Sequence, residues 1–301
     1  MEHLETRELA YFVAVGEEQH VGRAAERLGM AQPPLSRAIK KLERRVGVPL
    51  LERAGRGVRL TPAGVVLLHE GRKVLDAAAA AGQRARRAAE ATPRLVLATK
   101  PNADVGLLPD ILSRYAGQYA QAGVDVHVCD VGEQAGLLRT GAADLALMHL
   151  PYDDVSGFDT ELLHVAGQVA ILPSGHRLAG RTALRLDDLR GETMPRWPAM
   201  TGPGPEVRDT SQLMQLIALG QTIALMPDTV TERLRRDLIA VPVLDAAPVS
   251  LVLAWPERSR STALAAFVRA AAEVAARHGT DAGDVGAAPR WVGSGVWNIA
   301  R

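Results

Sequence analysis

Apolar residues recur at helical spacing in the first part of the chain. Residues 8–18 carry them at positions 9, 12, 13 and 15. Residues 20–29 carry them at positions 21, 24, 25 and 28, before a terminal glycine. This spacing gathers the apolar side chains on one helical face, and a glycine commonly ends a helix. The chain therefore begins with two short amphipathic helices.

A third helix is predicted from the segment AQPPLSRAIKKLE, residues 31–43. Two prolines are tolerated in the first helical turn, because the N–H groups there have no intrahelical partner. One face of this helix carries Leu35, Ile39, Leu42 and Val46, and another carries Ser36, Arg37, Lys40, Lys41 and Arg44. With a short turn at residues 29–31, the pattern predicts a helix-turn-helix whose last helix has a free basic face.

The next segment, residues 49–64, reads as two short strands around the turn AGRG, with arginines at positions 53, 56 and 59. A basic hairpin that follows a helix-turn-helix is typical of a winged helix. Residues 20–60 contain 10 basic and 3 acidic residues, although the net charge of the whole chain is only +1. Such a local excess of cations favours contact with DNA phosphates. A solvated basic helix is the alternative, and the turn, the prolines and the hairpin together weigh against it.

A long helix is predicted to start at Thr61-Pro62 and to run to about Glu90, since the segment is rich in alanine and lacks proline. Beyond Pro93, apolar strand-like runs alternate with helical patterns. This order predicts an α/β fold with a largely parallel sheet, in two halves with a ligand cleft between them. The segments concerned are 94–98, 104–119, 124–131, 133–141, 143–150, 164–173, 211–220, 222–227 and 261–279.

The stretch AAERLGMAQPPLSRAIKKLERRVGVPLLERAGRGVRLTPAG resembles the DNA-binding domain of LysR-type transcriptional regulators. Its AQPPLSR and LLER variants most resemble the subgroup that controls catabolism of aromatic compounds and their ring-cleavage products. The segments LLPDIL, LLRTGAADLALM and IALGQTIALMP are similar to patterns of the family's effector domain, which itself resembles periplasmic binding proteins. The expected domains are a winged helix-turn-helix (1–61), a linker and dimerisation helix (62–92), an effector-binding domain (93–279) and a C-terminal tail (280–301).

The resemblance implies roles for residues of the basic helix and of the wing. The start of the recognition helix would face the DNA groove, Lys40 and Lys41 would approach phosphates or base edges, and the wing arginines would reach the flanking backbone. By chemistry, Gln32 suits adenine and Arg37 suits guanine. The expected DNA-binding residues are Gln32, Pro33, Pro34, Ser36, Arg37, Lys40, Lys41, Arg53, Arg56 and Arg59.

The resemblance also implies a small-molecule effector near the end of the first strand of the effector domain. A cation and a hydroxyl near a helix N-terminus favour a carboxylate ligand. A solvated loop lysine is the alternative for Lys100. The expected effector-binding residues are Thr99, Lys100, Asn102, Met148, His149 and Thr201.

Two regions depart from the family pattern. The segment WPAMTGPGPEVRDT, residues 197–210, is some two dozen residues shorter than is usual there, and this shortened rim argues against a ligand pocket of the family's usual form. The extension after residue 280 carries Trp291 and Trp297 on a glycine-rich chain. It is either a disordered tail or a segment that packs across a subdomain or a partner.

No catalytic or cofactor motif accompanies this pattern. The histidines lack metal-ligand spacing, and the single cysteine, Cys129, reads as a buried structural thiol. We therefore expect no enzyme activity, no cofactor and no metal. One cysteine, no signal-like start and no membrane-length apolar run indicate a cytoplasmic protein without a membrane partner.

The predicted function is a regulator that binds promoter DNA as a homodimer or homotetramer, with RNA polymerase as a further candidate partner. An architectural or constitutive DNA-binding protein with a ligand-free C-terminal domain is the alternative.

Overall fold

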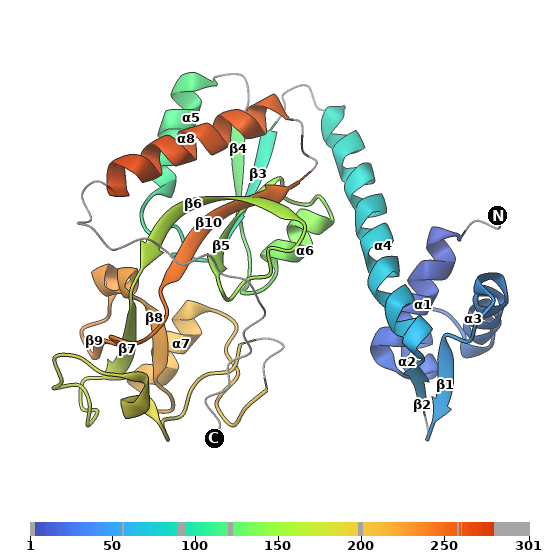
Figure 1. The fold of residues 1–301 in the computed structure, drawn as a ribbon, viewed down its shortest axis with the longest axis horizontal. Helices are drawn as coiled ribbons and strands as arrows, with labels where there is room; N and C mark the ends of the chain where they lie inside the picture. Colours follow the sequence, from blue (N-terminus) through green and yellow to red (C-terminus); the bar gives the residue numbers. More distant parts are fainter. Residues whose placement is uncertain are drawn as a thin grey trace. The chain divides into compact units, whose positions relative to one another are not determined.

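The computed structural model describes residues 4–55, 57–89, 94–119, 123–197, 201–257, 259 and 261–279 (Figure 1). The chain divides into two compact units. The main boundary between them lies near the end of the long helix, between Arg86 and Arg87. The predicted tail, 280–301, lies outside the described residues.

The N-terminal unit is a three-helix cluster with a two-stranded wing and the long helix. Its elements are α1 (Thr6–Glu18), α2 (Val21–Arg27), α3 (Gln32–Val46), β1 (Leu51–Ala54), β2 (Gly57–Leu60) and α4 (Pro62–Ala88). Phe12 of α1 and Leu35, Ile39 and Leu42 of α3 meet in one buried core. The predicted apolar face of α3 is thus confirmed at three positions. The prediction is wrong at Val46, which is 36% exposed in the last turn before the helix ends at Gly47.

The beginning of α4 fits closely against the base of the wing. The Thr61 hydroxyl donates to the Pro49 carbonyl, 2.8 Å away, and accepts from the backbone N–H of Gly64, 3.0 Å away. A Cβ on Gly64 would lie 2.1 Å from the Leu50 carbonyl oxygen. Only glycine permits this approach, and it fixes the wing relative to the start of α4.

The described residues of the C-terminal unit form two sheets. The five-stranded sheet has the order β4-β3-β5-β10-β6, and the three-stranded sheet has the order β8-β7-β9. The strands are β3 (Arg94–Thr99), β4 (Gly123–Val128), β5 (Leu145–Leu150), β6 (Phe158–Ala166), β7 (Gln168–Pro173), β8 (Ala224–Pro227), β9 (Leu238–Pro242) and β10 (Val249–Pro256). The helices are α5 (Leu108–Gln118), α6 (Gln134–Arg139), α7 (Thr210–Ala218) and α8 (Thr262–Gly279), and Leu186–Leu189 and Asp228–Arg233 form short 3₁₀ helices.

Strand direction differs between the two sheets. β3 pairs in parallel with β4 and β5, as predicted, while β10 runs antiparallel to β5 and β6. In the second sheet β7 is antiparallel to both neighbours, so the expectation of a largely parallel sheet is wrong there. The predicted single run at residues 164–173 divides at Gly167 into β6 and β7, which belong to different sheets.

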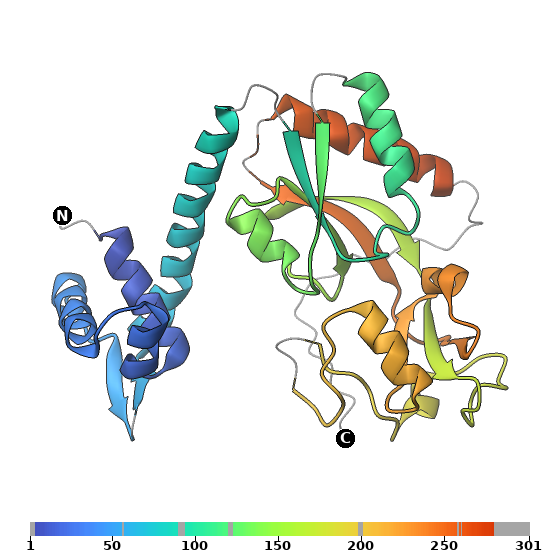
Figure 2. The ribbon, with the colours of Figure 1, turned by 180° about the vertical axis from the view of Figure 1, so that it is seen from behind.

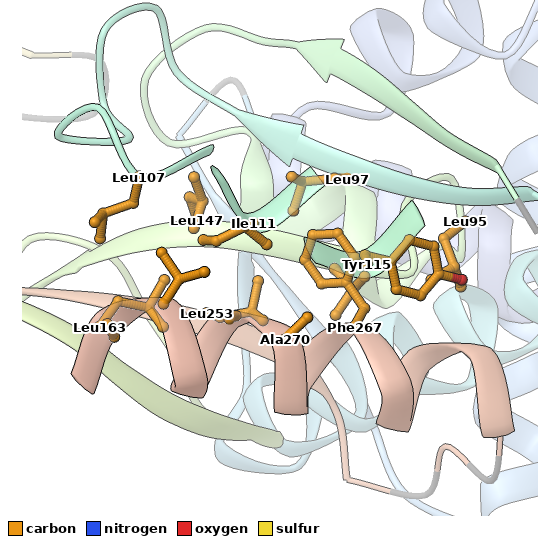
Figure 3. Packing of buried hydrophobic residues seen from close by; sticks show 14 of the residues in the cluster. Leu95, Leu97, Leu107, Ile111, Tyr115, Leu147, Leu163, Leu253, Phe267 and Ala270 are labelled. Atoms are coloured by element: carbon orange, nitrogen blue, oxygen red, sulfur yellow. The ribbon is translucent and has the colours of Figure 1, made fainter. Parts of the chain in front are cut away.

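Helices cover both faces of the five-stranded sheet. Leu97 and Leu147 point to one face, where α5 and α8 supply Tyr115 and Phe267, whose ring centroids are 5.3 Å apart (Figure 3). Alternate strand residues, including Met148, point to the other face and pack on α6. In the view from behind, α7 lies beside the three-stranded sheet (Figure 2). The strand alternation therefore assigns each side chain near the strand ends to a definite face.

The shortened segment after Trp197 returns to the chain that precedes it. The backbone N–H of Arg196 donates to Pro205, the N–H of Val207 donates to Arg196, and the Arg196 guanidinium donates to the Gly204 carbonyl, 3.0 Å away. A Cβ on Gly204 would lie 1.7 Å from the Met194 carbonyl oxygen. The described part of this short rim is thus held to the preceding chain by backbone hydrogen bonds and by the Arg196 side chain.

Candidate nucleic-acid interface and ligand site

The exposed face of α3 is cationic. Arg37 and Lys40 are exposed and have no carboxylate partner among the described residues, and Arg44 donates to the backbone oxygen of Lys40. The helix starts at Gln32 with prolines in its first turn and ends in a left-handed Gly47. A groove beside this face is lined by Arg37, Lys40, Glu43, Arg44, Gly47, Val48 and Pro49.

Four of the residues predicted at the start of α3 occupy one helical face. Positions 33, 36, 37 and 40 follow the spacing i, i+3, i+4 and i+7, which brings them together on a helix. Gln32, Pro33 and Arg37 are exposed, while Pro34 and Ser36 are half-buried. The free donors of this face match the acceptors in a DNA major groove.

Lys41 follows Arg37 by one turn of α3 and differs from it in having a carboxylate partner. Its ammonium is 3.5 Å from Glu8, a buried carboxylate of α1 that also binds the Arg45 guanidinium at 2.7 Å. This three-residue network joins α1 to α3. Unlike Arg37 and Lys40, the predicted DNA-binding residue Lys41 is therefore ion-paired within the N-terminal unit.

The wing contributes further cations. Arg53 is exposed on β1, while Arg59 on β2 binds Glu52 across the hairpin at 2.7 Å. Arg56 lies outside the described residues. Glu43 of α3 accepts the backbone N–H groups of Leu50 and Leu51 at 2.8 and 3.1 Å. Glu43 thus fixes the entry to the wing, a role that no sequence pattern signalled within the basic helix.

The candidate ligand site lies where β3, β4 and β5 end at one edge of their parallel sheet. Thr99 is buried at the end of β3. The side chain of Lys100 is 12% exposed, and its ammonium lies 2.7 Å from Asp153, whose side chain is 5% exposed. Lys100 is therefore a nearly buried, ion-paired cation. Asp153 was not predicted, because it is distant in sequence and lies in the turn after β5.

The other predicted effector-binding residues are dispersed. Met148 is 1% exposed and packs in the core under α6, which favours a structural role. Asn102 is exposed just after β3, with a backbone φ of 57°. Thr201 is exposed in the short loop before α7. Of the predicted set, Thr99, Lys100 and His149 gather at the ends of neighbouring strands.

The imidazole of His149 is neutral at this edge of the sheet. Burial, followed by the nearby Lys100 ammonium, lowers its pKa from 6.5 to about 4, while Asp153 acts in the opposite direction. Its Nδ1 has no hydrogen-bond partner among the described residues. The site thus combines one cation, one anion and a neutral imidazole.

The lowered pKa of His149 predicts an acid-sensitive fold. Between about pH 6.5 and 4 the unfolded chain binds the proton more readily than the folded chain, so the free energy of unfolding falls as the pH falls. We expect His149 to account for a loss of about 2 kcal/mol between pH 7 and pH 5. Urea unfolding at both pH values measures it. The His149→Gln variant should lack this part of the loss, and equal losses in both proteins would contradict the assignment.

Cys129 is a buried thiol whose sulfur lies 3.6 Å from the Thr99 carbonyl oxygen. Burial, with a contribution from Glu133, raises its pKa to about 11. We therefore expect the native thiol to react with iodoacetamide at pH 8 about 100-fold more slowly than the denatured thiol. Mass spectrometry of both samples over time measures this ratio. Comparable rates would contradict the inert role assigned to this cysteine.

The described residues contain no group of three or more histidine, cysteine or acidic side chains arranged to hold a metal ion. Among the helices of the described ranges, none has the length and apolarity needed to cross a membrane.

Two family models match this chain. Residues 6–65 match the model described as bacterial regulatory helix-turn-helix protein, lysR family, and residues 88–276 match the model described as LysR substrate binding domain. The chain is 30% identical to the Hca operon transcriptional activator HcaR of Escherichia coli, over 88% of this chain and 96% of that protein. It is 34% identical to the transcriptional regulator AlsR of Bacillus subtilis, over 65% of this chain and 67% of that protein.

Solved structures agree in fold. Full-length BenM has a TM-score of 0.51 at 26% identity, covering 92% of this chain and 98% of that one. CbnR, a LysR family transcriptional regulator, has a TM-score of 0.55 at 23% identity, covering 90% and 99%. Family models thus match both the N-terminal and the C-terminal part of the chain, and the similarity to HcaR covers 88% of it. The chain belongs to the LysR family and is a LysR-type transcriptional regulator.

Proposed function

We propose that this regulator binds promoter DNA through the Arg37–Lys40 face of α3, with the wing on the adjacent backbone. The observation that carries the proposal is the pair of exposed cations on a helix whose opposite face is buried. Gln32 and Arg37 have the donors for base edges, while Ser36, Lys40, Arg53 and Arg59 suit phosphates. The active form is a homodimer through the linker helix, or a dimer of such dimers, acting in the cytoplasm and contacting RNA polymerase.

The effector in this proposal is a small carboxylate bound at the edge formed by β3 and β5. The support is the nearly buried ammonium of Lys100 close to the neutral imidazole of His149. The Thr99 hydroxyl at the end of β3 donates to the Lys100 carbonyl, 3.2 Å away. Ligand shifts DNA binding only through different affinities for two arrangements of the dimer. No turnover of the effector is expected, in keeping with relatives named as transcriptional regulators.

A thermal-shift screen of the full chain against small organic acids tests the effector. Aromatic carboxylates and ring-cleavage diacids form the core of the panel, with the corresponding amides as neutral controls. A bound acid should raise the melting temperature with a concentration dependence that follows RT ln(1 + [L]/Kd). Stabilisation by the amides as strong as that by the acids would contradict a carboxylate effector.

A further inference from the structure

The Lys100 ammonium already holds a carboxylate that the chain itself supplies. Asp153 Oδ2 lies 2.7 Å from Lys100 Nζ and also accepts the backbone N–H of His149 at 2.6 Å. Both charged side chains are nearly buried. The place that an anionic ligand would take beside Lys100 is thus occupied by a residue of the same protein.

A tight turn delivers Asp153 to this position. The backbone N–H groups of Tyr152 and Asp153 both donate to the His149 carbonyl, each at 2.9 Å. The carboxylate of Asp153 then folds back onto the N–H of His149 at the end of β5. We name residues 149–153 the Asp153 turn. These backbone bonds end on His149, whereas the ion pair with Lys100 links the turn directly to the end of β3.

The Asp153 turn also contacts the segments that cross between the two sheets. The Tyr152 hydroxyl donates to the Gln168 side-chain oxygen, 2.9 Å away, and the Gln168 amide nitrogen donates to the Ala247 carbonyl. Gln168 is the first residue of β7 and is buried, while Ala247 lies between β9 and β10. One hydrogen-bonded chain therefore runs from the turn to both crossovers.

A second carboxylate beside Lys100 would meet Asp153 in a poorly hydrated site. Like charges a few ångströms apart repel strongly where water is excluded, and one ammonium cannot fully neutralise two carboxylates. The neutral His149 supplies no further cation. An anionic ligand must therefore take the place of Asp153 on Lys100.

We propose that Asp153 is an internal competitor for the effector's carboxylate, which holds Lys100 until an anionic ligand replaces it. This inference rests on the carboxylate effector proposed above. Replacement frees the Asp153 turn from β3 and loosens the Tyr152–Gln168 contact with the crossovers. Asp153 thereby sets the effector concentration needed for a response. The Asp153 turn is the segment that transmits this response to the crossovers between the two sheets.

The test compares the full-length wild-type chain with the Asp153→Asn variant. Asparagine keeps an oxygen acceptor for the His149 N–H but removes the competing charge. Benzoate and benzamide, with acetate and acetamide as the smallest such pair, are titrated by calorimetry. We expect carboxylates to bind the variant at least about 10-fold more tightly than the wild type, and amides to bind both equally. The Lys100→Met/Asp153→Asn double variant should lose the gain.

Equal carboxylate affinities in the wild type and a folded Asp153→Asn variant would overturn the inference, as would an equal gain for the amides. A second measurement needs no variant. Hydrogen exchange of the wild-type segment 149–155 should become faster at high benzoate concentration and remain unchanged with benzamide. Unchanged or slower exchange with benzoate overturns the release of the turn.

DNA binding separates the inference from the proposed function. The wild type is tested on a genomic fragment that it selects itself, with and without the carboxylates. Suppose that the wild type binds specific DNA and responds to a carboxylate, but the Asp153→Asn variant binds that carboxylate no more tightly. This result refutes only the role of Asp153 as an internal competitor. Absence of specific DNA binding refutes the proposed function itself.

Discussion

Replacing Arg37 and Lys40 together by alanine is expected to weaken binding to the operator by at least about 100-fold. Arg37 is in position for a base edge and Lys40 for a phosphate, and the loss of such contacts costs about 1–3 kcal/mol for the base contact alone. Both side chains are exposed and have no carboxylate partner among the described residues, so the fold should be unaffected. Fluorescence anisotropy with a labelled duplex gives the affinity, and thermal melting reports the fold.

The matched control is Lys41→Ala on the same helix. It removes the same charge as Lys40→Ala, but Lys41 faces Glu8 and α1. We expect Lys41→Ala to weaken DNA binding clearly less than Lys40→Ala, and to lower the salt dependence less. Undiminished binding by the Arg37/Lys40 double variant would refute α3 as the DNA-contacting element.

Lys100→Met is expected to lower the free energy of unfolding by about 3–5 kcal/mol, the usual result of removing one partner from a buried ion pair. The carboxylate of Asp153 would remain, with its side chain only 5% exposed and without its cation. Asp153 would keep the hydrogen bond from the His149 N–H, but this single bond cannot replace the positive charge of the ammonium. Urea unfolding at pH 7.5 measures the difference.

The paired change Lys100→Met/Asp153→Asn serves as its control. The neutral amide removes the uncompensated charge, so the double variant should recover most of the stability lost by Lys100→Met. The two changes are then strongly non-additive, as expected for residues in contact. Lys100→Met with wild-type stability would show that the pair is solvated in solution.

The DNA-binding half was largely predictable because its signals are local. The prolines, the glycine after the helix and the spacing of Leu35, Ile39 and Leu42 all act within a few residues. Val46 follows the same spacing but is exposed, since the spacing of apolar residues along a helix does not show where the neighbouring helices end. The ion pair of Lys41 could not be predicted, because Glu8 is distant in sequence and only the fold brings this buried carboxylate beside Lys41.

The effector half was less predictable because its contacts are distant in sequence. Parallel pairing of β3 with β5 brings Lys100 to Asp153, and no local pattern relates the two. β9 and β10 were not predicted, and short apolar runs do not encode strand direction. The antiparallel second sheet therefore became visible only in the structure.

Sequence-specific DNA binding is tested by selecting genomic DNA fragments with the purified protein and sequencing them. A sequence-specific regulator should yield a few sharp sites, each with two-fold symmetric half-sites about one helical turn or a multiple apart, and the Arg37/Lys40 double variant should yield none. Broad, featureless coverage of the genome would contradict this and indicate an architectural DNA-binding protein instead.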